Sequence, residues 1–96
     1  MPIVNVIAKI TTKPGMREKV LKIFEQNIPN VLAEEGCIEY SPTIDLEGVG
    51  DLQTPLGPDT YVVIEKWASL ENLMAHAVAP HMKIYASKVQ DMLDSR

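Results

Sequence analysis

The sequence predicts an α+β fold, in which one antiparallel sheet carries its helices on a single face. Two observations support this class. Strand-like and helix-like patterns follow one another in the order strand, helix, strand, strand, helix, and crossovers between such strands place their helices on the same side of a sheet. With 96 residues, the chain is too short to divide, because domains usually hold about 100–150 residues. We therefore expect a single domain over residues 1–96.

The first strand and the first helix are predicted over residues 3–32. Residues 3–12 are rich in β-branched types with short apolar runs, which is typical of a strand covered on both faces. Residues 13–15 (Lys-Pro-Gly) end it. Apolar residues then recur every three or four positions from Val20 to Leu32, the spacing of one helical stripe. Pro29 lies inside this stripe and is expected to kink or split the helix near Asn27.

Two further strands and a long loop follow the helix. Gly36 is positioned for a left-handed helix cap, and residues 37–45 form the second strand, in which Pro42 indicates an edge position or a bulge. Residues 61–67 alternate as a third strand. Between them, residues 47–59 are rich in Gly and Pro, and loops of that length often act as lids.

The end of the chain is predicted to be helical. Ser69 is placed to cap a helix, and Pro80 is placed to begin another. His76 and His81 flank the junction between the two helices.

Composition excludes several classes of function. Nine Lys and Arg against thirteen Asp and Glu give a net charge of −4, without the basic stripe that binds phosphates, so nucleic acid is not an expected partner. The single cysteine, Cys37, excludes a disulfide framework and a Cys-rich zinc site. No uncharged run approaches the roughly 20 residues that span a bilayer. We expect a cytoplasmic protein with no membrane span.

The third strand carries the first candidate site residues. Alternation along residues 61–67 puts Glu65 and Trp67 on one face together with Tyr61 and Val63. An acid beside an indole suits the wall of a pocket. The alternative is purely structural, with Trp67 as a core anchor and Glu65 as a hydrogen-bonded acid.

The two histidines are the other candidates. His76 and His81 lie five residues apart across Pro80, unlike the i, i+4 pair of helical zinc sites, so no metal site is predicted. Either can act as a general acid or base, because imidazole titrates near neutral pH. The structural alternative is a histidine satisfied at a helix cap or an interface.

An uncovered sheet face predicts self-association. With all helices on one side, the other side of the sheet exposes valine, isoleucine and aromatic residues, which a small monomer cannot readily leave in water. We therefore expect a homodimer in which two sheets stack face to face.

Several short motifs resemble those of the antibiotic biosynthesis monooxygenase family, and most closely its small quinol monooxygenase branch. The resemblance covers about residues 3–93. Its motifs are Lys13-Pro14-Gly15, Glu34-Glu35-Gly36-Cys37 followed by Tyr40, Glu65-x-Trp67, His76 and Pro80-His81. It implies a ferredoxin-like antiparallel sheet that dimerises into an α/β barrel. Members of the family continue into a fourth strand, whereas this sequence stops at Asp94-Ser95-Arg96, so the fourth strand is expected to be absent.

The resemblance also implies a reaction. Members of that branch oxidise quinols or phenolic aromatics with O₂ and need no flavin, haem or metal, so no cofactor is expected. His76 or Glu65 would be the catalytic base. Substrate would be bound by Trp67 as a flat wall, by Tyr40 or Tyr85 as a hydrogen-bond partner, and by His81.

Two other functions stay open at this point. One is a non-catalytic dimeric module that binds a small molecule. The other is an isomerase of a phosphorylated autoinducer sugar, whose sequences look similar around His76 and Pro80-His81. A cavity of roughly 300 Å³ or more at Glu65, Trp67 and His76 would favour the oxygenase, because a bicyclic ring needs about that space.

Overall fold

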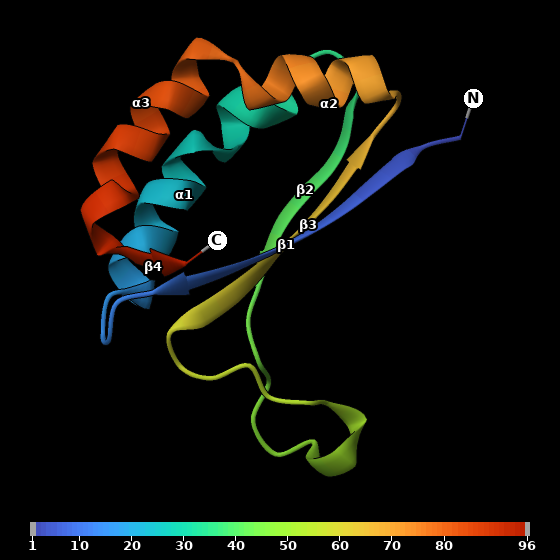
Figure 1. Cartoon of the computed structure of the whole chain (residues 1–96). Helices are drawn as coiled ribbons and strands as arrows, with labels where there is room; N and C mark the ends of the chain where they lie inside the picture. Colours follow the sequence, from blue (N-terminus) through green and yellow to red (C-terminus); the bar gives the residue numbers. More distant parts are fainter. Residues whose placement is uncertain (1, 96) are drawn as a thin grey trace.

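The computed structural model describes residues 2–95 and shows one antiparallel sheet of four strands (Figure 1). Its elements are β1 (Val4–Thr12), α1 (Arg17–Leu32), β2 (Cys37–Thr43), β3 (Thr60–Trp67), α2 (Leu70–Ala77), α3 (Pro80–Val89) and β4 (Leu93–Ser95), with short 3-10 helices at Gly50–Leu52 and Gln90–Met92. The strand order is β2-β3-β1-β4, and the helices lie on one side of the sheet (Figure 1). The predicted α+β class, with the ferredoxin-like order of elements, is therefore confirmed.

The expectation that the fourth strand is absent is wrong. β4 follows a 3-10 turn and pairs with Thr11 and Thr12 at the end of β1. The strand is only three residues long, Leu93–Ser95, and so short a segment shows no alternation from which a strand can be inferred. The sheet is open within one chain, because β2 and β4 are its two edges.

Side chains alternate between the two faces of the sheet, as predicted for the third strand. Along β1 and β3 the helix-facing positions pair across the ladder, with buried Ile10 opposite Tyr61 and partly buried Ala8 opposite Val63. These residues face the helices and form the core with Val20, Phe24 and Val31 of α1. Removing such apolar surface from water drives the folding of a chain this small.

Helix α1 runs through Pro29 without a break, so the predicted split near Asn27 does not occur. Proline removes only its own N–H donor, and the helix resumes at once, with the Ala33 N–H donating to the Pro29 carbonyl over 3.1 Å. Val31, fully buried, anchors the last turn. Among the described helices, none is long and apolar enough to cross a membrane.

The corner between α2 and α3 forms as predicted. The Ser69 hydroxyl accepts a hydrogen bond from the Asn72 N–H, which caps α2, and Pro80 occupies the start of α3. Gly36, before β2, has a φ of +80°, in the left-handed region that glycine adopts without strain. Its open Cα side lies against the side chain of Asn72.

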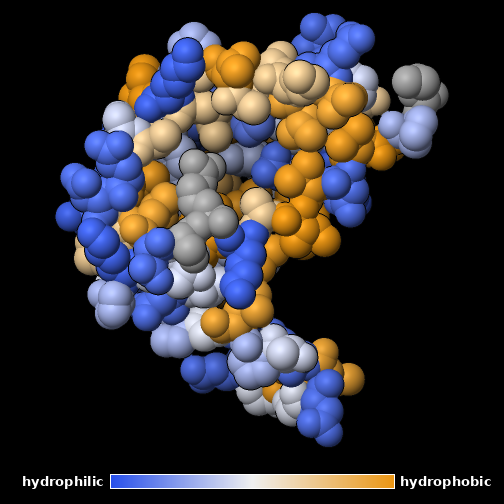
Figure 2. Space-filling view, viewed as in Figure 1, coloured by the Kyte–Doolittle hydropathy of each residue, from blue (hydrophilic) through white to orange (hydrophobic). Residues whose placement is uncertain are grey.

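The face of the sheet away from the helices is not covered within the chain. Ile7 of β1 is 69% exposed and pairs with Ile64 of β3, and Ile38, in the irregular start of β2, is 51% exposed. Figure 2 shows hydrophobic side chains along this side, above a hollow that the loop before β3 borders. The first strand was expected to be covered on both faces, and one chain covers only one of them.

The long loop, predicted as a lid, projects beyond the sheet at the end opposite α2 (Figure 1). It is held by its own polar contacts, since the Asp45 carboxylate accepts from the N–H groups of Leu56 and Gly57 over 2.8 and 2.9 Å. The loop leads into the first residue of β3, Thr60, whereas α2 begins shortly after the last residue of β3, Trp67. At roughly 3.3 Å per residue, the length of β3 separates the loop from α2 in the same chain.

We expect Gly36→Ala to destabilise the protein more than Gly15→Ala. Both glycines have nearly the same positive φ, +80° and +78°, so each alanine bears the left-handed penalty of about 1 kcal/mol. Only at Gly36 would the new methyl overlap the Asn72 side chain, whereas nothing lies near it at Gly15. Displacing Asn72 disturbs the cap of α2, which adds about 1 kcal/mol. Urea denaturation of both variants measures this, and equal losses would contradict the close approach.

Candidate functional site

The centre of the candidate site is His76, in the last turn of α2 and only 6% exposed. Its Nδ1 lies 2.7 Å from Oε2 of Glu34, which follows the end of α1. An ionised carboxylate can only accept a hydrogen bond, so Nδ1 carries the proton and donates it to Glu34. Nε2, the second ring nitrogen, lies 3.9 Å from Oε1 of Glu65. The imidazole is therefore held between two carboxylates.

Glu65 and Trp67 come together on the helix-facing side of β3, as their spacing predicts. The Trp67 indole donates from Nε1 to Oε1 of Glu65 over 3.0 Å. The indole ring also lies against the His76 ring, with centroids 4.6 Å apart and planes tilted by 34°. Trp67 is fully buried and Glu65 is 7% exposed. These three side chains thus form one buried group, in which Trp67 is hydrogen-bonded to Glu65 and packs against His76.

Of the other three predicted site residues, Tyr40 and His81 lie beside His76 or Glu34, and Tyr85 does not. Tyr40, opposite Glu65 in the β2–β3 register, meets the His76 ring edge-on at 5.5 Å. Tyr85 of α3 lies elsewhere in the core, with its hydroxyl 3.2 Å from that of Tyr61. His81, on α3, joins Glu34, Glu65, Trp67 and His76 in what we call the cluster, because its Nε2 lies 3.6 Å from Oε1 of Glu34. The helix corner therefore brings both histidines to the two oxygens of one carboxylate.

Glu34 is the member that sequence reasoning did not assign to the site. In the sequence it stands only at the expected helix end and in the Glu-Glu-Gly-Cys motif. A signal was present, because an acidic residue beside the negative end of a helix dipole is unfavourable without a partner. In the structure two histidines provide that partner.

The electrostatics of the cluster also act on Cys37, the first residue of β2. Burial raises the pKa of the Cys37 thiol, and the negative charges of Glu34 and Glu65 raise it further. A thiol that keeps its proton is a weak nucleophile and a weak metal ligand. Within residues 2–95, no three His, Cys, Asp or Glu side chains are grouped so that they could hold a metal ion.

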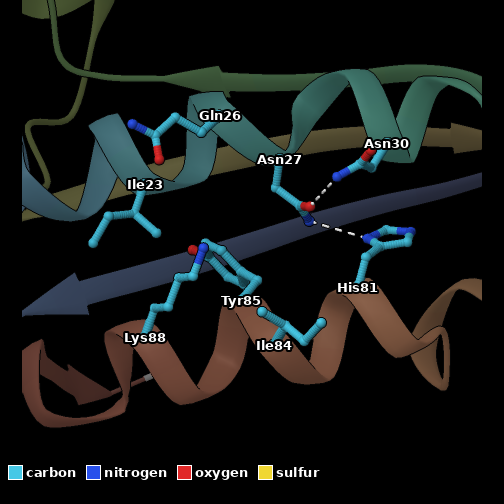
Figure 3. A pocket seen from close by; sticks show the side chains of 8 residues that line it. All are labelled: Ile23, Gln26, Asn27, Asn30, His81, Ile84, Tyr85 and Lys88. Carbon is cyan, nitrogen blue, oxygen red and sulfur yellow. Dashed lines mark hydrogen bonds between the residues drawn. The ribbon is translucent and has the colours of Figure 1, made fainter.

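A groove lies beside the cluster, between α1 and α3 (Figure 3). Its volume is about 150 Å³, and it is lined by Ile23, Gln26, Asn27, Asn30, His81, Ile84, Tyr85 and Lys88. His81 and Tyr85 therefore reach a cavity, whereas Glu65, Trp67 and His76 do not line it. The groove is smaller than the roughly 300 Å³ typical of small-molecule pockets.

Comparison with known proteins places these residues in context. The chain is 43% identical over 93 residues to the Escherichia coli K12 protein named "Probable quinol monooxygenase YgiN", covering 94% of this chain and 88% of that relative. The Shigella flexneri protein of the same name gives the same values.

Solved structures share the fold. A conserved protein from Methanosarcina mazei Go1 superposes with a TM-score of 0.81 at 26% identity, covering 100% of this chain and 86% of the other. Rv0793 from Mycobacterium tuberculosis gives 0.77 at 24% identity, covering 99% and 87%. The family model described as Antibiotic biosynthesis monooxygenase matches residues 3–88. With its motifs, its fold and this match in agreement, the chain belongs to the antibiotic biosynthesis monooxygenase family.

Proposed function

We propose that this chain oxidises a quinol or a related phenolic aromatic with O₂, using no cofactor. The observation that carries the proposal is the buried imidazole of His76, held by Glu34 at 2.7 Å and lying against the Trp67 indole. A base and a flat apolar wall are what the oxidation of a phenol requires. The 43% identity to a protein named as a probable quinol monooxygenase supports the same substrate class.

His76 acts as the base in this mechanism. Glu34 holds the proton on Nδ1, which leaves the Nε2 lone pair free to accept the proton of a substrate hydroxyl. The carboxylate also stabilises the imidazolium that results, as the acid of a catalytic triad does. Glu65 is the second candidate, but its Oε1 already accepts the Trp67 N–H. His76 is therefore the better placed of the two.

The oxidation balances without an added reductant. The phenolate, being negatively charged, gives an electron to O₂ more readily than the neutral phenol, and the radical pair then forms a carbon–oxygen bond. Cleavage of the O–O bond leaves one oxygen atom on the ring, while the other takes up two protons and departs as water. A quinol with a free ring position thus becomes a hydroxyquinone, and the substrate supplies all four electrons that O₂ accepts.

The other predicted site residues take positioning roles in the proposal. Trp67 provides the flat wall, and Tyr40, edge-on to His76, is the closer hydrogen-bond partner for a substrate oxygen. Tyr85 and His81 line the groove through which the ring would approach. Because that groove holds about 150 Å³, a bicyclic ring fits only where lining side chains of α3, such as Ile84 and Lys88, turn outward while the His76–Glu34 bond stays in place.

The close packing of the cluster favours one alternative function. With Trp67 fully buried and His76 and Glu65 nearly so, these residues also fit a non-catalytic module that binds a small molecule in the groove. Such a module would bind a quinol without consuming O₂. The uptake experiment below separates the two functions.

We also propose that the protein is a cytoplasmic homodimer that stacks the uncovered faces of two sheets. Ile7 and Ile64 form an apolar pair on that face, with exposed Ile38 farther along β2, and a second copy of the same sheet can cover them by two-fold symmetry. Such stacking would complete the α/β barrel that the open sheet of one chain leaves unfinished.

We expect metal-free protein to consume O₂ with reduced naphthoquinols, and His76→Gln to lower that rate by about 100-fold or more, the usual contribution of a general base. Glutamine retains a hydrogen-bond donor for Glu34 but cannot accept the proton. Oxygen-electrode traces corrected for autoxidation measure the rate, and mass spectrometry of the ¹⁸O-labelled product shows whether one oxygen atom enters the ring.

Leu70→Asp, an exposed change on α2, serves as the matched control and should leave the rate unchanged. Full uptake by folded His76→Gln would remove His76 from the mechanism. Binding of the quinol by the wild type without any uptake would support the binding module.

We expect Ile7→Asp to shift the protein from dimer to monomer, because a carboxylate at the centre of a stacked apolar face is buried without a partner. Leu70→Asp is again the control, since Leu70 is 59% exposed and Ile7 is 69% exposed, on opposite sides of the sheet. Light scattering during size exclusion measures the mass. A monomeric wild type, or an Ile7→Asp variant that stays dimeric, would exclude this interface.

A further inference from the structure

A chain of polar contacts runs from the buried His76 to the groove between α1 and α3. Glu34 accepts from His76 on one oxygen at 2.7 Å, and its other oxygen lies 3.6 Å from His81 Nε2. His81 Nδ1 in turn meets the amide of Asn27 at 3.2 Å. Figure 3 shows Asn27 of α1 and His81 of α3 facing one another across this groove.

Exposure increases steadily along this chain. The side chain of His76 is 7% exposed, that of Glu34 is 16% and that of His81 is 25%. His81 is therefore the member that reaches solvent. The reaction releases no net proton, because the departing oxygen takes up two. A connection to solvent would let His76 give up the substrate proton while the phenolate reacts and take one back when that oxygen leaves.

We propose that Glu34 and His81 form a proton relay between His76 and the solvent in the α1–α3 groove. The inference rests on the proposed function for the source of the proton. When Nε2 of His76 accepts a substrate proton, the Nδ1 proton moves to Glu34, and the neutral carboxyl group passes a proton to Nε2 of His81. His81 then releases its Nδ1 proton to water, which leaves His76 with its proton on Nε2. The same steps in reverse bring a proton from water to Nδ1 of His76 while Nε2 gives its proton to the departing oxygen, and each residue returns to its starting protonation.

Asn27 permits the tautomer change that this relay needs. In the structure the Asn27 amide nitrogen faces His81 Nδ1, while its oxygen accepts from Asn30 over 3.0 Å. That arrangement suits His81 with its proton on Nε2. A half-turn of the amide presents the oxygen instead, which accepts from Nδ1–H and frees Nε2 to receive a proton. Asn27 therefore fits either tautomer of His81.

The neighbouring ionisable groups do not offer an equal route. Glu65, on the Nε2 side of His76, is only 7% exposed and holds the Trp67 indole. Cys37 has a raised pKa and keeps its proton beside Glu34 and Glu65. Among the described titratable groups that face Glu34, His81 alone also lines the groove.

The first test measures the relay without any substrate. The proton shared by His76 and Glu34 should give a far-downfield NMR signal, because the bond is short and buried. Saturation transfer from water measures its exchange rate. We expect His81→Phe, which keeps the ring volume but carries no proton, to slow that exchange about tenfold, and Gln26→Leu, elsewhere in the groove, to leave it unchanged.

The second test uses turnover. O₂ uptake by His81→Phe should fall about tenfold in dilute buffer and recover as imidazole buffer is added, whereas wild-type uptake should not depend on the buffer. A purely structural role for His81 would give a loss that imidazole does not restore. If His81→Phe fails to fold, Asn27→Leu, which removes the tautomer partner, should show the same slower exchange.

The two tests can fail independently, so their outcomes distinguish the relay from the proposed reaction. Unchanged exchange in His81→Phe, or in Asn27→Leu where that variant replaces it, overturns the relay. Wild-type protein that consumes no O₂ overturns the proposed function, and the exchange measurement still decides whether His81 connects His76 to water.

Discussion

The hydrogen bond between His76 and Glu34 is the contact on which the arrangement of the helices above the sheet depends. It joins Glu34, just after α1, to the last turn of α2 over 2.7 Å, and the Glu34 side chain is only 16% exposed. A hydrogen bond to a charged group contributes about 1.5–3 kcal/mol. Loss of one partner costs more, about 3–5 kcal/mol, because a buried charge is then left without compensation. The bond therefore holds the corner in place as well as the imidazole.

The same contact explains why residues that stabilise the fold and residues of the candidate site lie at the same end of the sheet. The Glu34 carboxylate follows α1, and the indole and the two histidines come from β3, α2 and α3, so no single element can move without disturbing the others. Polar networks of this kind stabilise a fold only when each member has a partner. The loop before β3 lies at the other end and is free of that constraint, which agrees with its own internal hydrogen bonds.

Much of the candidate site could be predicted because strand alternation is a local property. Glu65 and Trp67 lie two residues apart, so they share a face in any strand that contains them. Their contact with His76, and the place of Tyr40 opposite Glu65, depend on strand pairing and on the turn of the helix corner, which no local pattern encodes. Tyr85 illustrates what local patterns cannot predict. Its position in a helical apolar stripe predicts that it is buried, but only the packing of the elements decides that its hydroxyl meets Tyr61 rather than His76.

By itself the sequence determined the fold class, the order of the elements up to α3, the helix cap at Ser69 and the left-handed turn at Gly36, since each follows from the period of apolar residues or from the backbone angles that a residue tolerates. Only the tertiary structure decided that Leu93–Ser95 pairs as β4, that α1 continues through Pro29, and that Glu34 lies between His76 and His81. These features depend on contacts between residues far apart in the chain. Their free energy comes from burial and from pairing of charges, which becomes visible only when the elements are packed together.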